Sequence, residues 1–248
     1  MIDRVPQDRK HLRLSLLGGF SYEADGMAVL VPDGSQRVLA FLALRGHTVR
    51  RRVAAGTLWP AVSEDHASSS LRSALARLGP TARGSVLATT KEIGLSPYVA
   101  VDLWDSRDLA QLLTAPRRSS SSAFEPDVSA IDDLSNELLP GWYDDWVLVE
   151  AEDWRQVRLH ALEALAYLLL ERRQYAEAAT AALAAVRAEP LRESPRAALI
   201  RIHISEGNLS EALREFAKYG ELLRHELGIE PTEQLRSLVS QLVPVAAR

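Results

Sequence analysis

Two stretches near the end of the chain share one helical pattern at a fixed distance, and this spacing constrains how the second half can fold. Tyr175–Ala178 and Leu209–Ala212 begin 34 positions apart (175 to 209), and each has an apolar residue, a small residue, a glutamate and an alanine in that order. Ala182 and Phe216 keep the same offset. A repeat of this length is typical of paired helices that stack on one another and bury a continuous core.

The apolar periodicity around these stretches predicts an all-helical second half. Apolar residues recur at a spacing of three and four, and Pro190, Pro195 and Gly207 mark the breaks between the segments. The period is that of tetratricopeptide repeats. The predicted helices are Trp154–Arg172, Tyr175–Ala188, Ser194–Glu206, Leu209–Glu226 and a last one that runs to about Val243.

The first half opens with short strands. His11–Gly18 alternates apolar and polar residues, Phe20–Ala24 follows a Gly-Gly break, and Asp25-Gly26 is a hairpin turn signal before Met27–Val31. We therefore expect a small antiparallel sheet at the start of the chain.

Three helices and a hairpin follow these strands. The helices are predicted at Gln36–Leu44, Val53–Trp59 and Glu64–Leu78, with Pro60 closing the second and Gly79-Pro80 stopping the third. Ser85–Thr90 then reads as a strand, Lys91-Glu92 as a turn, and Ile93–Leu95 with Val99–Val101 as the return. This order predicts a winged helix, in which the third helix enters the major groove of DNA and the hairpin follows the backbone.

The third helix is the candidate DNA-reading element. Its apolar stripe predicts a buried side, and its opposite side carries small polar residues and two arginines but no acid, which suits contact with phosphates and base edges. An ordinary surface helix with two arginines remains the alternative. The predicted buried residues are Ala67, Leu71, Ala74, Leu75 and Leu78, and the predicted DNA-binding residues are Ser69, Ser70, Arg72, Ser73 and Arg77.

Further DNA contacts are predicted outside that helix. Arg50, Arg51 and Arg52 lie just before the positive end of the second helix, where they do not serve helix stability, although a solvated charge run is the simpler interpretation. The predicted wing offers Thr89, Thr90 and Lys91, and its Glu92 would repel phosphate.

The charge distribution supports two functional halves. The net charge is −4, yet residues 1–115 hold 14 of the 29 Lys and Arg and only 11 of the 33 Asp and Glu. A basic first half and an acidic second half fit a DNA-binding module followed by a protein-binding module. The polar start of the chain and the lack of a run of roughly 20 apolar residues lead us to expect a cytoplasmic, nucleoid-associated protein.

Sequence patterns of enzymes are absent. There is no cysteine, no Gly-rich phosphate loop, no Gly-x-Ser-x-Gly elbow and no metal-ligand spacing among the six histidines. Asp144 and Asp145 are adjacent in the sequence, so their side chains point in different directions and are not expected to share a substrate. We interpret them as capping or solvated residues. We expect no enzymatic activity, no catalytic residues, no cofactor and no metal.

Several motifs resemble a known family of regulators. The order of strands, helices and hairpin is similar to the DNA-binding domain of OmpR/PhoB-type regulators, and more specific stretches resemble the Streptomyces antibiotic regulatory proteins, whose bacterial transcriptional activation domain begins with a similar Trp-Tyr-Asp-Asp-Trp motif. Those stretches are Leu58–Pro60, Ser70–Leu78, Val101–Trp104, Leu139–Val147, Arg155–Leu162 and Leu227–Thr232.

The resemblance implies a mainly α fold with a small β portion. It divides the chain into a disordered or irregular tail at 1–11, a winged helix-turn-helix at 12–104 with flanking antiparallel strands, and a tetratricopeptide-like activation domain at 105–248 with a Ser-rich loop at 116–126.

The resemblance also implies an activator that binds direct repeats in double-stranded promoter DNA and recruits RNA polymerase holoenzyme through its sigma factor. It implies a homodimer, at least on DNA, that controls a cluster for antibiotic or other specialised-metabolite biosynthesis. A protein-interaction adaptor with a degenerate winged helix and a ligand-responsive repressor are the alternatives.

Overall fold

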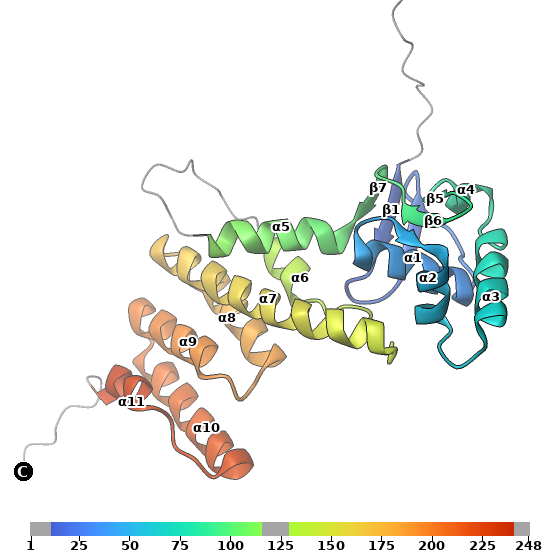
Figure 1. Ribbon diagram of the computed structural model, residues 1–248. Helices are drawn as coiled ribbons and strands as arrows, with labels where there is room; N and C mark the ends of the chain where they lie inside the picture. Colours follow the sequence, from blue (N-terminus) through green and yellow to red (C-terminus); the bar gives the residue numbers. More distant parts are fainter. Residues whose placement is uncertain (1–10, 116–128, 241–248) are drawn as a thin grey trace, which may run out of the picture. The chain divides into compact units, whose positions relative to one another are not determined.

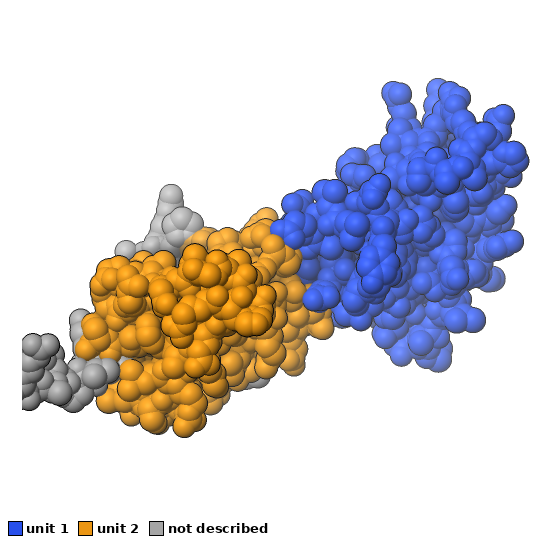
Figure 2. All heavy atoms as spheres, turned by 90° about the horizontal axis from the view of Figure 1, so that it is seen from below, with its two compact units in different colours: residues 1–105, 137–154 blue, residues 106–136, 155–248 orange. Residues whose placement is uncertain are grey.

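The computed structural model describes residues 11–115 and 129–240, which form two compact units (Figure 2). Unit 1 comprises residues up to Asp105 together with Glu137–Trp154, and unit 2 comprises Ser106–Asn136 and the residues from Arg155 onward. Residues 1–10 of the predicted tail and the whole predicted Ser-rich loop at 116–126 lie outside the described residues. The domain boundary after residue 104 stays a prediction.

Unit 1 begins with the predicted hairpin. β2 (Ser21–Ala24) pairs antiparallel with both β1 (Leu12–Ser15) and β3 (Met27–Ala28). Asp25 and Gly26 both have positive φ, at 54° and 76°, as the expected tight turn requires. The hairpin and the start of the sheet are therefore confirmed.

The strand Val99–Val101, β7, corrects the sequence interpretation. It was expected to be part of the wing, but it pairs parallel with β1 and completes a four-stranded sheet in the order β3-β2-β1-β7. Val99 and Val101 are buried while Ala100 is exposed, so the strand packs one side onto the core.

Asp102 ties the end of this sheet to the next helix, α5 (Asp102–Thr114). Its carboxylate accepts backbone hydrogen bonds from Leu16 at 2.9 and 3.0 Å, from Leu17 at 3.1 Å and from Leu103 at 2.7 Å. Burial raises the pKa of Asp102, and these three backbone donors oppose the rise because they stabilise the ionised form. A single side chain thus joins β1, β7 and α5.

Three helices form the next part of unit 1 (Figure 1). They are α1 (Asp33–Arg45), α2 (Arg51–Leu58) and α3 (Glu64–Ala76), and all three contact one another. The trio was predicted, although α1 begins earlier and α2 takes Arg51 and Arg52 into its first turn. Gly46 ends α1 in the left-handed conformation, at φ 66°.

The region after α3 differs from the sequence prediction. Gly79-Pro80 does not stop α3, which ends at Ala76 with Arg77 as its C-cap; instead these two residues start a short helix, α4 (Pro80–Arg83). Proline is well tolerated at the first position of a helix because its missing N–H would have no partner there. Leu78 is buried as expected.

The wing is a three-stranded sheet in the order β4-β6-β5. The predicted hairpin is confirmed as β5 (Val86–Ala88) and β6 (Glu92–Leu95), and β4 (Val49–Arg50), which the sequence did not reveal, pairs with β6. Gly94 allows this arrangement, since a Cβ at this position would lie 2.8 Å from the side chain of Thr48.

Residues 137–154 return to unit 1 and pack on α1. Trp146 meets Phe41 edge-on at 5.6 Å between ring centroids and Trp142 at 6.3 Å. Both carboxylate oxygens of Asp144 accept hydrogen bonds from the guanidinium of Arg37 at 2.7 Å, and Arg37 also donates to the carbonyl of Leu58 at 2.8 Å. Asp144 does precede the helix that begins at Asp145, and its carbonyl accepts the backbone N–H of Leu148 at 2.9 Å. Its carboxylate, however, forms a half-buried ion pair, which the interpretation as a capping or solvated residue did not include.

Replacing Asp144 with Asn is expected to lower the free energy of unfolding by about 1–2 kcal/mol, because Arg37 would lose its charged partner while its guanidinium stays half-buried. Urea unfolding followed by tryptophan fluorescence would measure the change. Asp145→Asn is the matched control, since Asp145 is exposed in the first turn of α7 (Asp145–Glu171). A control variant as unstable as Asp144→Asn would contradict the assignment.

Unit 2 is helical in the described part, and its predicted repeat is confirmed as stacked helices. α8 (Tyr175–Ala188) packs on α9 (Glu193–Glu206), and α9 packs on α10 (Leu209–Leu227) (Figure 1). Buried alanines of α8 allow this close approach. The other helices of the described part of unit 2 are α5 from Ser106 onward, α6 (Ser129–Ser135), which the sequence did not reveal, the C-terminal part of α7, and α11 (Glu233–Ser240).

The fold class is thus the expected one, mainly α with a small β portion, a winged helix and a tetratricopeptide-like helical part. The predicted end of the last helix at Val243 lies outside the described residues. Within residues 11–115 and 129–240, none of the helices has the length and apolar character needed to cross a bilayer.

Candidate nucleic-acid interface

The apolar side of α3 fixes the helix in unit 1. Ala67, Leu71 and Ala74 are buried in a core shared with α1 and α2, and Leu75 packs against it. Ser35 at the start of α1 donates a hydrogen bond to the carbonyl of Ala74 at 2.7 Å. The predicted buried stripe is confirmed, and it sets which side of α3 faces outward.

The opposite side of α3 carries the five residues predicted from the sequence. Ser69, Arg72, Ser73 and Arg77 are exposed, and Ser70 is half-buried. These positions are open to solvent in unit 1, as a DNA-reading face requires. Their role in binding stays a prediction.

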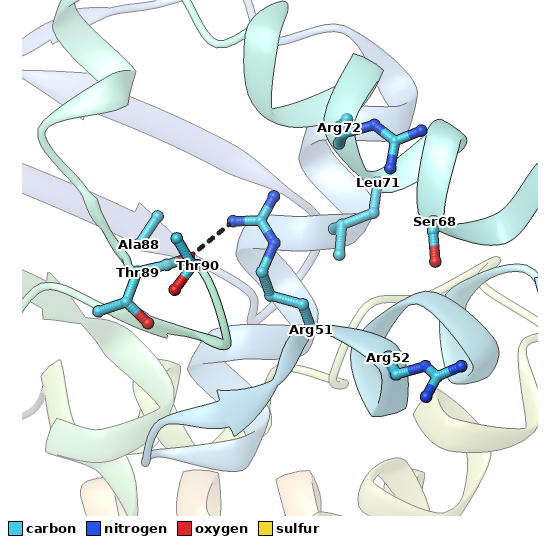
Figure 3. Close-up of a pocket in the computed structure, with 8 residues that line it drawn as sticks. All are labelled: Arg51, Arg52, Ser68, Leu71, Arg72, Ala88, Thr89 and Thr90. Carbon is cyan, nitrogen blue, oxygen red and sulfur yellow. Dashed lines mark hydrogen bonds between the residues drawn. The ribbon is translucent and has the colours of Figure 1, made fainter. Parts of the chain in front are cut away.

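A groove lies between α3, the first turn of α2 and the end of β5 (Figure 3). Its volume is about 780 Å³. It brings together five of the predicted DNA-binding residues from these three elements. The lining residues are Arg51, Arg52, Ser68, Leu71, Arg72, Ala88, Thr89 and Thr90.

The wing turn and α2 are joined at this groove. The backbone N–H of Arg51 donates to the carbonyl of Lys91 at 2.9 Å, and its guanidinium donates to the carbonyl of Thr89 at 3.3 Å (Figure 3). The Thr89 hydroxyl accepts the backbone N–H groups of Lys91 and Glu92 at 3.3 and 3.0 Å. The Thr89 hydroxyl therefore shapes the turn that presents Thr90 and Lys91.

The charges around the groove are mostly uncompensated. Arg52 forms an exposed ion pair with Glu64. Within the described ranges, no carboxylate lies within 4.0 Å of the other predicted cations, and Glu92 is the cross-strand neighbour of Arg50 without forming an ion pair. Those cations are Arg50, Arg51, Arg72, Arg77 and Lys91. The surface formed by the groove, the outer side of α3 and the wing turn is therefore electropositive, which favours a phosphate-bearing partner.

Two polar residues near this surface were not predicted from the sequence. Ser68 lines the groove, and its position four residues before Arg72 would have placed it on the same side of the helix. Arg83 of α4 donates to the carbonyl of Ala76 at 3.2 Å and so caps the C-terminal end of α3. No local signal pointed to Arg83, because α4 was not predicted.

The comparisons with known proteins agree with this architecture. The bacterial transcriptional activator domain family matches residues 100–243. The chain is 28% identical over 262 residues to the regulatory protein AfsR of Streptomyces coelicolor, which covers 97% of this chain and 26% of AfsR. It is 34% identical over 105 residues to AfsR of Streptomyces griseus, which covers 42% of this chain and 10% of that protein. The chain thus spans about a quarter or less of the length of these relatives.

A solved structure shares the fold. Mycobacterium tuberculosis EmbR, in complex with a low affinity phosphopeptide, superposes with a TM-score of 0.66 at 20% sequence identity, over 94% of this chain and 65% of EmbR. The family match extends from β7 through α11, and the AfsR similarity adds the winged helix. The chain therefore belongs to the bacterial transcriptional activator domain family.

Proposed function

We propose that this chain binds promoter DNA in a sequence-specific manner through unit 1 and activates transcription by recruiting RNA polymerase holoenzyme. The observation that carries the proposal is the set of uncompensated cations contributed by α2, α3 and the wing turn around one groove. Ion pairs with carboxylates engage several arginines of unit 2, among them Arg155, Arg192 and Arg196. Among the described residues, Arg51, Arg72 and Lys91 have no such partner. Cations kept free of carboxylates are available to displace counterions from DNA.

The residues of α3 have two roles in this proposal. Arg72 and Arg77 contact base edges and phosphates in the major groove, and the hydroxyls of Ser69, Ser70 and Ser73 bond phosphate oxygens. An arginine on a recognition helix can pair with both acceptors of guanine, while serine hydroxyls fix the register without reading sequence. This division assigns specificity mainly to the two arginines.

In this proposal, residues of the wing and of α2 contact the phosphate backbone of the DNA. Lys91 and Thr90 contact phosphates from the wing turn, Thr89 shapes that turn, and Arg50, Arg51 and Arg52 contact phosphates at the start of α2. Such contacts strengthen binding to any sequence to the same extent.

The domain proposal places DNA binding in residues 12–104 and activation in residues 105–248. The second part would contact RNA polymerase through its sigma factor and support a homodimer on direct repeats, with control of a specialised-metabolite cluster as its biological role. Support comes from the regulatory nature of AfsR and from the stacked helices of unit 2, which present extended surfaces to protein partners.

A binding titration tests the proposal directly. Fluorescence anisotropy with labelled fragments of promoters next to the gene, at several salt concentrations, should show a steep loss of affinity with salt and a preference for one fragment. Footprinting would then locate the repeats. Binding that is weak, insensitive to salt and equal for all fragments would instead identify a protein-interaction adaptor.

A further inference from the structure

A second cavity lies entirely within unit 2, far along the chain from the groove. It has a volume of about 360 Å³ and is lined by residues of α7, α9 and α11. That volume is at the lower end of the roughly 300–1,000 Å³ typical of small-molecule sites. The lining residues are Tyr167, Glu193, Ser194, Ala197, Arg201, Gln234, Leu235 and Leu238.

Arg201 is the unusual residue of this cavity. Its half-buried guanidinium donates a hydrogen bond to the hydroxyl of Tyr167 at 2.6 Å and lies 5.8 Å from the centre of the same ring. In the described part of the chain, no carboxylate lies within 4.0 Å of it. The charge of Arg201 is therefore held in place by a neutral partner.

Two other arginines, one just before α9 and one within it, behave differently. Arg192 pairs with Glu163 at 2.8 Å, and Arg196 pairs with Glu215 at 3.0 Å. A partly buried guanidinium is ordinarily compensated in this way, since leaving it unpaired costs free energy. Arg201 thus combines an uncompensated charge with an adjacent cavity.

The acids near the cavity are already engaged. The carboxylate of Glu193 accepts hydrogen bonds from the backbone N–H of Thr232 at 2.9 Å and from its hydroxyl. Glu163 accepts a hydrogen bond from Ser194 at 3.0 Å in addition to its pair with Arg192. Glu163 is neutralised by Arg192, whereas Glu193 has only neutral donors and keeps its negative charge where it lines the cavity. The guanidinium of Arg201 is therefore the group of this cavity that attracts an anion.

The remaining lining is suited to an apolar group. Ala197, Leu235 and Leu238 supply aliphatic surface, and the ring of Tyr167 supplies an aromatic one. Gln234, exposed on α11, adds an amide that can donate a hydrogen bond. Apolar walls with a few polar groups are the usual composition of a small-molecule site.

We propose that this cavity binds a small organic acid whose carboxylate pairs with Arg201 and whose apolar body packs against Ala197, Leu235 and Leu238. The guanidinium offers two parallel donors, which match a carboxylate and distinguish it from a neutral group. The site is separate from the DNA-binding residues and goes beyond the proposed activator function.

Isothermal titration calorimetry with the full chain tests this site. The probes are benzoate, hexanoate and 4-phenylbutyrate, each compared with its uncharged amide at millimolar concentration. We expect at least one carboxylate to bind and its amide to bind roughly 10- to 100-fold more weakly, because the amide cannot form the charged pair.

Variants locate the binding. Arg201→Met keeps the aliphatic stem but removes the charge, and it should weaken carboxylate binding roughly 10- to 100-fold. Arg201→Lys keeps the charge without the planar fork and should lose several-fold. Arg236→Met is the matched control, because Arg236 pairs with Glu233 on α11 and does not line the cavity. Circular dichroism would verify that each variant is folded. If Arg201→Met does not fold, the binding measured with Arg201→Lys tests the proposal in its place.

Three results would overturn the proposal. The first is that none of the three carboxylates binds, the second is that a carboxylate and its amide bind alike, and the third is that a folded Arg201 variant binds as tightly as the unaltered chain. The variant with alanine at Arg51 and Arg72 should retain binding, since those residues line the other groove. Loss of binding in that variant would assign the probes to the electropositive surface instead.

Discussion

Replacing both Arg51 and Arg72 with alanine is expected to weaken binding to promoter DNA by about 100-fold, since each lost contact is worth on the order of one decade in affinity and the two add when independent. The two guanidiniums line the same groove from different helices, and within the described residues neither has a carboxylate partner. The slope of log affinity against log salt should also become shallower by about 2, one unit for each lost cation.

The two single variants distinguish a residue that recognises the base sequence from a residue that contacts the DNA phosphates. Arg72→Ala should also relax the preference among promoter fragments, whereas Arg51→Ala should weaken all fragments equally. Arg13→Ala is the control, because Arg13 is exposed on β1 and does not line the groove. A folded double variant that binds within a factor of about two of the unaltered chain would refute the assignment of this groove, because even one phosphate contact is worth more.

The second large effect concerns stability. Replacing Asp102 with alanine is expected to lower the free energy of unfolding by roughly 3 kcal/mol, because three backbone N–H groups in partly buried positions lose their acceptor together. These groups lie just after the end of β1 and at the start of α5, so the loss would loosen this edge of the four-stranded sheet. Urea unfolding of the full chain gives the measurement.

Two further variants make the Asp102 result specific. Asp102→Asn keeps one carbonyl oxygen as an acceptor and should cost less than Asp102→Ala. Asp105→Ala removes an exposed acid from the same first turn and should change stability by less than about 1 kcal/mol. If Asp105→Ala were as damaging as Asp102→Ala, helix-dipole effects and not the backbone hydrogen bonds would explain the loss.

Local signals in the sequence predicted the elements that depend on neighbouring residues. The Asp25-Gly26 turn, the apolar stripe of α3 and the Tyr175–Ala188 helix follow from residue type and spacing within a few positions. The parallel partner of β7 did not follow, because β1 lies more than 80 residues away and such pairing leaves no short-range pattern. The short strand β4 and helix α4 were missed because two to four residues carry too little pattern.

The sequence likewise predicted some features of the candidate site and not others. Helical spacing predicted which residues of α3 are exposed, since burial of the other side follows from the periodicity. Spacing could not predict that Arg51 and Thr89, 38 positions apart, meet at one groove, nor that Asp144 would pair with Arg37 across 107 positions. Those contacts depend on the packing of the whole unit.

The ion pair between Arg37 and Asp144 has a practical consequence for dissection of the chain. The polypeptide passes between the two units after residues 105, 136 and 154, so truncation at one point cannot release an intact unit 1. A fragment ending at residue 105 would lack Asp144, the ion-pair partner of Arg37, and Trp146, which contacts the ring of Phe41. A fragment that contains the whole of unit 1 must therefore include residues 137–154, either reconnected to the N-terminal part or supplied as a separate peptide.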